Sequence, residues 1–144
     1  MGEVIQGKPL IAGRSSGEAL VSAEPLSFWG GYNYQTGEII DQRHPLSGFS
    51  AAGRILAVPF TRGSSSTTAV LLEAIRSMRA PAAILTTGRD PFLALASIVA
   101  TELYGRSTPV IALSTTDFGK LKTGDFVEID ENGSICVNPP NAGL

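Results

Sequence analysis

The stretch AVPFTRGSSSTTAVLLEAIR, residues 57–76, decides the fold. Its apolar start stops at Pro59, a glycine and three serines follow, and apolar residues then recur at helical spacing. A short apolar run is typical of a buried strand, and spacings of three and four residues are typical of an amphipathic helix. The stretch therefore predicts a strand that turns into a helix through RGSSS, residues 62–66, which we call the serine turn.

The residues around this unit repeat its pattern. Short apolar runs predict three buried strands, and the segments between them predict two helices. The second helix has clear ends, because Asp90-Pro91 suits an N-cap followed by proline and Gly105 suits a C-terminal stop. This alternation predicts a parallel βαβαβ core. The predicted strands are 54–58, 82–85 and 109–113. The first predicted helix follows the serine turn, with apolar residues at helical spacing from Val70 to Met78, and the second covers 91–104.

Segments on both sides of this core predict further β structure. In the glycine-rich N-terminal part, turn signals separate strands near 9–13, 17–22 and 38–41, the last after a turn at Thr36-Gly37. An Asn132-Gly133 turn between alternating apolar residues predicts a C-terminal hairpin. The fold class is therefore α/β, a single domain over residues 1–144 with a glycine-rich β layer, a parallel core and a closing hairpin.

Size, charge and cysteine content exclude several classes of protein. The 144 residues suit one domain, and a net charge of −2 with a pI of about 5.3 does not suggest the basic face of a nucleic-acid binder. One cysteine, Cys136, excludes an internal disulfide framework and favours the reducing cytoplasm. Every apolar run is shorter than the ~20 residues of a membrane span, and the N-terminus lacks a signal-peptide pattern. We expect a cytoplasmic protein that binds neither membranes nor nucleic acid.

The serine turn has two interpretations from its residues alone. Unpaired backbone N–H groups and the helix dipole make a helix N-terminus a seat for an anion, and Arg62 adds positive charge. The alternative is ordinary helix capping, for which serine and threonine are favoured. Capping needs one hydroxyl, whereas five hydroxyl residues follow one another from Ser64 to Thr68. The segment is not a phosphate-binding P-loop, because the closing Gly-Lys-Ser/Thr is missing.

Other reactive residues give weaker signals. Phe28 and Trp29 precede Gly30-Gly31, which favours an interface or a loop that a ligand approaches closely. The single histidine, His44, is more often a hydrogen-bonding residue than a catalyst, and Cys136 lies in a strand pattern typical of a buried thiol. No spacing of histidine and cysteine typical of a metal site occurs, so no metal ligand is predicted in this chain.

Three motifs in a fixed order identify a family. SFWGG, D-x-R-H-P-L-x-G and RGSSS together resemble the swivelling domain of aconitase X, and the resemblance extends from about Gly7 to Asp130. It implies a swivelling β/β/α fold and membership of the aconitase superfamily of hydro-lyases. It also implies that the chain is a separate small subunit, inactive alone, which pairs with a large subunit as a heterodimer or larger assembly. That partner would hold the iron or iron–sulfur cluster.

The resemblance also assigns roles to the serine turn. Aconitases carry a G-S-S-R motif whose first serine is the catalytic base, and the matching positions here are Gly63 to Ser66. Ser64 is thus the expected base, with Ser65 next, and Ser66 stands where the family has the arginine that grips a carboxylate. Residues expected to contact the small hydroxy acid substrate are Arg62, Gly63, Ser66, His44, Gly30 and Gly31.

Two substrates follow from the family, and a rival class stays open. Bacterial members resemble cis-3-hydroxy-L-proline dehydratase, which forms Δ1-pyrroline-2-carboxylate, and archaeal members resemble phosphomevalonate dehydratase. The chain has three lysines and lacks the Lys and Glu enrichment of hyperthermophiles, which favours hydroxyproline. The rival hypothesis is a non-catalytic binding or regulatory module, in one version a phosphate carrier that uses His44.

Overall fold

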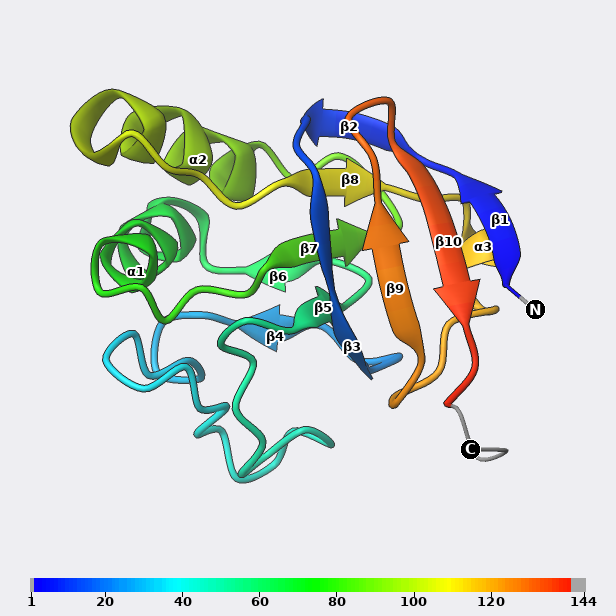
Figure 1. The fold of residues 1–144 in the computed structure, drawn as a ribbon. Coiled ribbons are helices and arrows are strands. Elements are labelled where there is room, and N and C mark those ends of the chain that lie inside the picture. Colours follow the sequence, from blue (N-terminus) through cyan, green and yellow to red (C-terminus); the bar gives the residue numbers. More distant parts are fainter. Residues whose placement is uncertain (1, 141–144) are drawn as a thin grey trace.

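The computed structural model describes residues 2–140 and shows an α/β fold, as predicted (Figure 1). One sheet has eight strands in the order β1-β10-β9-β3-β5-β7-β8-β2, and β4 pairs with β6 in a separate two-stranded sheet. The strands are β1 Glu3–Gln6, β2 Lys8–Ile11, β3 Ser15–Val21, β4 Leu26–Ser27, β5 Ile55–Ala57, β6 Thr61–Arg62, β7 Ala83–Thr86, β8 Val110–Ala112, β9 Phe126–Ile129 and β10 Ser134–Asn138. The helices are α1 Ser64–Arg76, α2 Pro91–Tyr104 and α3 Thr115–Phe118.

The predicted βαβαβ core is confirmed. Strands β5, β7 and β8 pair in parallel, and α1 and α2 connect them. Both predicted ends of α2 are correct, because Asp90 accepts hydrogen bonds from two backbone N–H groups and Gly105 has a φ of 69°. Alternate strand residues face opposite sides, so Leu56 and Ile84 pack toward the helices while Ile55 and Leu85 lie in a second core.

The eight-stranded sheet curves so strongly that its two edge strands, β1 and β2, follow each other directly in the chain. Strands β1 and β2 lie at opposite ends of the strand order, yet Gly7 alone separates them in the chain. A side chain at Gly7 would place its Cβ 2.4 Å from Ile111, and the tip of the β9–β10 hairpin also packs here, with the Gly7 N–H donating to the Gly133 carbonyl. The second apolar core therefore lies inside a sheet that is nearly closed on itself.

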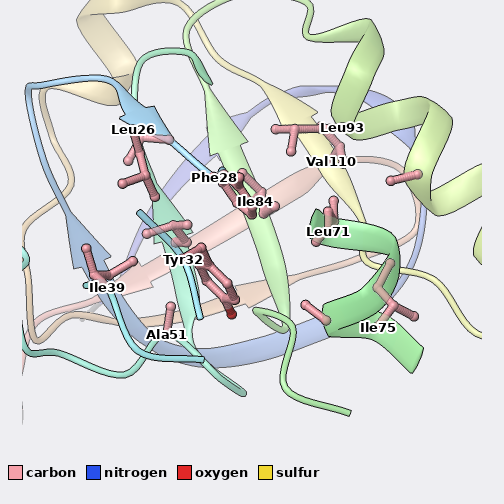
Figure 2. Packing of buried hydrophobic residues seen from close by; sticks show 14 of the residues in the cluster. Leu26, Phe28, Tyr32, Ile39, Ala51, Leu71, Ile75, Ile84, Leu93 and Val110 are labelled. Atoms are coloured by element: carbon pink, nitrogen blue, oxygen red, sulfur yellow. The ribbon is translucent and has the colours of Figure 1, made fainter. Parts of the chain in front are cut away.

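The first core lies between the sheet and the helices. Leu71 and Ile75 of α1 and Leu93 of α2 pack toward Ile84, as Figure 2 shows. The loop after β4 adds Phe28, whose ring stacks on Tyr32 with 4.9 Å between centroids and an interplanar angle of 4°. Because Phe28 is fully buried, the position of this loop is fixed by the same core that holds the helices.

The structure corrects the sequence prediction in three places. The strand predicted at 38–41 is wrong, because only isolated bridges form there, from Tyr32 to Ile39 and from Glu38 to Ser50. The strand predicted near 9–13 begins and ends earlier, at Lys8–Ile11. Strands β1, β4 and β6 and helix α3 were not predicted, since two to four residues give too little periodicity. The C-terminal hairpin is confirmed, with β9 antiparallel to β10.

Candidate functional site

Strands β4 and β6 bring two distant loops together. The strands run parallel, with Leu26 opposite Thr61 and Ser27 opposite Arg62. Their carboxyl ends therefore lie side by side, and each continues into one of the glycine-containing segments of the sequence (Figure 1). The loop FWGG, residues 28–31, follows β4, and the serine turn spans the end of β6 and the start of α1. Ligands commonly bind at the carboxyl ends of parallel strands.

Helix α1 begins without a side-chain cap. Its N-cap residue is Gly63, with a φ of 115°, and no side chain accepts a hydrogen bond from the first N–H groups. The hydroxyls point the other way, because Ser66 donates to the Gly63 carbonyl and Thr67 donates to the Arg62 carbonyl. The capping interpretation is therefore wrong, and the start of the helix keeps N–H groups available for a ligand.

Ser64 and Ser65 are the exposed hydroxyls of the serine turn. Ser64 has a φ of 48°, which is one of two positive φ values at non-glycine residues among residues 2–140. Neither hydroxyl bonds to another protein group in this part of the chain, whereas those of Ser66 and Thr67 do. A non-glycine residue with a left-handed backbone, whose side chain makes no hydrogen bond that stabilises the fold, is typical of a functional position.

Arg62 supplies the positive charge of the site. Its side chain is exposed, and its guanidinium carbon lies 5.9 Å from the centre of the Phe60 ring. This contact orients the guanidinium and leaves its N–H groups available, because the ion pairs within residues 2–140 involve other residues. Arg62 lies two residues before Ser64 in the chain, so its charge and the N-terminal end of the α1 dipole have the same sign in this segment.

The FWGG loop combines an anchor with an exposed tip. Phe28 is buried, whereas Trp29 is 69% exposed and Gly30 has a φ of 78° with open space around it. Gly31 is buried, and a Cβ there would lie 2.1 Å from the Ser27 carbonyl oxygen, so no other residue fits. Tyr32 holds the base of the loop by donating to the Arg79 carbonyl at 2.6 Å, and burial raises the pKa of its phenol.

Ser27 is a site residue that the sequence analysis missed. Its hydroxyl donates to the Trp29 carbonyl at 3.1 Å, and it lies 3.9 Å from where a Cβ on Gly63 would be. It therefore connects the FWGG loop to the serine turn. No local pattern points to Ser27, because its position follows from the pairing of β4 with β6.

His44 and Gly31 are placed differently from the other predicted site residues. The structure brings Arg62, Gly63, the three serines and Gly30 to the ends of β4 and β6. His44 is only 7% exposed, its Nδ1 accepts from the Leu46 N–H at 3.1 Å, and its Nε2 lies 3.4 Å from the Glu24 carbonyl oxygen. Both ring nitrogens thus lie against backbone groups, one in its own loop and one in the connection between β3 and β4, and substrate contact by His44 stays a prediction.

The exposed groups of the candidate site, Arg62 to Ser65, lie on an open surface. A hollow of about 470 Å³ lies at the ends of β7 and β8, lined by residues such as Lys8, Arg89 and Ser114, and the serine turn does not contribute to it.

Within residues 2–140, no three histidine, cysteine, aspartate or glutamate side chains gather as a metal centre would require, so the described residues do not fit a metal cluster. The same residues form no helix long and apolar enough to cross a bilayer.

Comparisons with known proteins place the chain in a family. Residues 4–137 match the family model described as aconitase X swivel domain. A cis-3-hydroxy-L-proline dehydratase of Pseudomonas aeruginosa is 51% identical over 110 residues, which are 76% of this chain and 19% of that protein. The chain thus spans about a fifth of the length of that relative.

Two further proteins are similar over most of their length. A phosphomevalonate dehydratase small subunit of Methanothermobacter thermautotrophicus is 37% identical over 85% of this chain and 91% of its own. The crystal structure of the Thermococcus kodakaraensis aconitase X, in its holo form, matches with a TM-score of 0.83 and 30% identity, over 94% of this chain and 98% of that chain. The fold, the family model and these identities agree, and the chain belongs to the aconitase X swivel domain family.

Proposed function

We propose that this chain is the swivelling small unit of a hydro-lyase that dehydrates cis-3-hydroxy-L-proline to Δ1-pyrroline-2-carboxylate. Ser64 is the proposed base, Arg62 and the first N–H groups of α1 bind the negatively charged part of the substrate, and Ser65 is the neighbouring hydroxyl. The observation that carries this proposal is the start of α1, where Ser64 is exposed, uncapped and held at a φ of 48° beside Arg62.

The proposed chemistry at this chain is a proton transfer. Dehydration removes a proton from C2, next to the carboxylate, and breaks the bond between C3 and the hydroxyl oxygen, so that water leaves. The resulting double bond between C2 and C3 then rearranges to the Δ1 isomer. Serine has too high a pKa to be a base in water, and it can act as one only where positive charge and exclusion of water stabilise the alkoxide. Arg62 and the α1 dipole supply the positive charge.

Exclusion of water requires a second protein surface. Ser64, Arg62 and Trp29 are all exposed, so the site as it stands is open to solvent. We propose that a large unit closes it, with Trp29 in the contact, and that this unit holds the iron or iron–sulfur centre. The Methanothermobacter relative, whose name includes the words small subunit, supports a partner on a separate chain. The aconitase X family supports an iron centre on that partner.

A second substrate is supported by another observation. Phosphomevalonate dehydratase small subunits match this chain across most of their own length, although at 30–37% identity against 51% for the hydroxyproline enzyme of Pseudomonas aeruginosa. Both substrates are hydroxy acids, and phosphomevalonate would bring a second anionic group to the same region. Identity favours hydroxyproline, so phosphomevalonate is the alternative.

The test is activity of the native complex with both substrates. The chain is purified together with its large unit. The iron content of the complex and the formation of the dehydrated product from each substrate are then measured. We expect turnover of cis-3-hydroxy-L-proline, and a fall of about 10²–10⁴-fold in Ser64→Ala, the range for loss of a general base. Faster turnover of phosphomevalonate would select the alternative. Wild-type rates in Ser64→Ala, Ser65→Ala and the double variant would overturn the assignment of the base.

A further inference from the structure

A buried carboxylate connects the start of α2 to the strand that carries the serine turn. Asp90 is 6% exposed, and its Oδ1 accepts the N–H groups of Phe92 and Leu93 at 3.2 Å, as an N-cap does. Its Oδ2 accepts from Thr61 instead, from the backbone N–H at 3.3 Å and from Oγ1 at 2.5 Å. One carboxylate oxygen thus binds the start of α2, and the other binds the first residue of β6.

We propose that Asp90 is a positioning residue for the proposed base, acting through Thr61. Thr61 begins β6, which is two residues long, and Ser64 follows three positions later. A strand of this length has little rigidity of its own, and a two-stranded sheet is marginal in stability. The direction in which Ser64 leaves β6 therefore depends on what holds Thr61, and Asp90 is the side chain that does so.

Neighbouring contacts support the same role for this loop. Thr87 donates to the Pro59 carbonyl through its N–H and its Oγ1, both at 3.0 Å. Thr68 on α1 donates to the Phe92 carbonyl on α2 at 2.8 Å. The connection between β7 and α2 therefore fixes the path from β5 to α1 at two points, Pro59 and Thr61, and α2 itself contacts α1 at a third. The Asp90 contact is the nearest of the three to Ser64 in sequence.

The two roles of Asp90 can be separated by one substitution. Asparagine keeps a carbonyl oxygen for capping α2 and is as good an N-cap as aspartate. The nitrogen of its amide, which takes the place of Oδ2, only donates, so it cannot accept from the backbone N–H of Thr61, and the Thr61 hydroxyl loses its charged acceptor. Asp90→Asn should therefore keep the helix while releasing β6. Thr61→Val tests the same contact from the other side, and Thr61→Ser is the conservative variant that keeps the hydroxyl donor.

The first measurement is backbone hydrogen exchange in the full chain. We expect the hydrogen-bonded amides in this stretch, those of Thr61 and Ser66 among them, to exchange about tenfold faster or more in Asp90→Asn. A hydrogen bond to a charged group is worth at least about a tenfold factor. Amides of β7 and of the later turns of α2 should exchange as in the wild type. Unchanged exchange at Thr61 to Ser66 would overturn the proposal, and this readout requires no catalytic activity.

The second measurement is turnover by the native complex, which rests on the proposed function. A misplacement on the order of 1 Å lowers rates by up to about 10²-fold, so we expect kcat to fall about 10- to 100-fold with KM changed less than about threefold. Thr61→Val should fall likewise, Thr61→Ser should keep the wild-type rate, and the double variant Asp90→Asn/Thr61→Val should be no slower than the slower single one. An unchanged kcat in Asp90→Asn would overturn the role of Asp90 in the reaction.

A second buried aspartate provides the matched control. Asp125 is 5% exposed and its Oδ2 accepts from the Lys122 N–H at 3.0 Å, in a turn between α3 and β9. Asp125→Asn should leave kcat and the exchange of Thr61 to Ser66 unchanged. An inactive wild-type complex would overturn the proposed function, and the exchange data would still decide whether Asp90 positions the turn. An equal loss of kcat in Asp125→Asn would mean that any buried aspartate matters to the fold, which contradicts a specific role for Asp90.

Discussion

Helices α1 and α2 lie side by side and begin in opposite ways. Helix α2 starts with an extended Asp90 whose carboxylate accepts two N–H groups, followed by proline at its first position. Helix α1 starts at a left-handed Gly63, has no side-chain cap, and holds Ser64 at a positive φ. The sequence around each start contains residues that could cap, so the difference lies in backbone geometry.

The difference indicates what each helix start is for. The start of α2 has its polar groups satisfied inside the protein, which stabilises the fold. The start of α1 leaves N–H groups, two hydroxyls and a guanidinium exposed, which stabilises nothing until a ligand or a partner arrives. One helix start contributes stability and the other is kept ready for binding, and four substitutions test this division.

The largest expected effect is on turnover in Ser64→Gly. Removing the proposed base should lower the rate about 10²–10⁴-fold, while the fold should become more stable by about 0.5–1 kcal/mol. The gain arises because a left-handed backbone costs an L-residue about 1–2 kcal/mol, of which the flexibility of glycine in the unfolded chain takes back part. Urea unfolding of the chain and turnover by the complex measure the two effects.

Met78 offers the matched control for this substitution. Its φ is 59°, its side chain is exposed, and it lies after the other end of α1. Met78→Gly should give a similar gain in stability with an unchanged rate. A loss of stability in Ser64→Gly would contradict the view that Ser64 is held in a strained backbone for chemistry.

Arg62→Gln should have the next largest effect, on substrate binding. A lost charge contact next to a helix N-terminus should raise KM about tenfold, with a smaller change in kcat. The effect should shrink as ionic strength rises, because Arg62 is exposed and its field is screened. Steady-state kinetics in a salt series measure this. Arg89→Gln, a change of the same charge in the loop before α2, is the control and should leave the salt dependence of KM as in the wild type.

Asp90→Ala should lower the stability of the fold, whereas Ser65→Ala should leave it unchanged. Loss of an N-cap costs about 0.5–2 kcal/mol, whereas the exposed Ser65 hydroxyl holds no other group of residues 2–140. Denaturant unfolding of both variants measures the contrast. An equal loss in Ser65→Ala would mean that Ser65 caps α1 after all, and the contrast between the two helix starts would disappear.

The smallest effect concerns the far end of α1, at high pH. Burial raises the pKa of Tyr32, whose phenol donates to the Arg79 carbonyl. The folded chain therefore keeps this proton above pH ~10, where an unfolded tyrosine loses it, so stability falls as pH rises past that point. In unfolding experiments between pH 10 and about 11, the free energy of unfolding of Tyr32→Phe should fall less steeply with pH than that of the wild type. Tyr34→Phe, at an exposed ring, is the control, and an equal change there would contradict the assignment to Tyr32.

The parts of the fold that were predictable are those with long periodic patterns. The run from Val70 to Ile75, the Asp90-Pro91 pair and the Asn132-Gly133 turn each contain enough local chemistry to fix an element. The two-residue strands β4 and β6 have no such pattern, because pairing across the chain creates them. Closure of the sheet at Gly7 depends likewise on contacts with Ile111 and Gly133.

The candidate site was predictable in part for the same reason. Gly63 and the serines stand out in the sequence, and their motif names the family. Capping was the wrong interpretation of those serines, since nothing local shows that Gly63 adopts a left-handed backbone and turns the hydroxyls of Ser66 and Thr67 away from the helix start. Ser27 and the second role of Asp90 depend on tertiary pairing, which a single sequence does not display.

The unbonded hydroxyls of Ser64 and Ser65 have an evolutionary consequence. Selection for a folded, abundant protein acts on residues that contribute stability, and these two side chains contribute none within the described chain. In a duplicated gene released from its reaction, Ser64 would be free to become glycine and would even be favoured, while Asp90 and Phe28 would persist. The residue at position 64 in a descendant would then record whether that lineage kept the chemistry or only the fold.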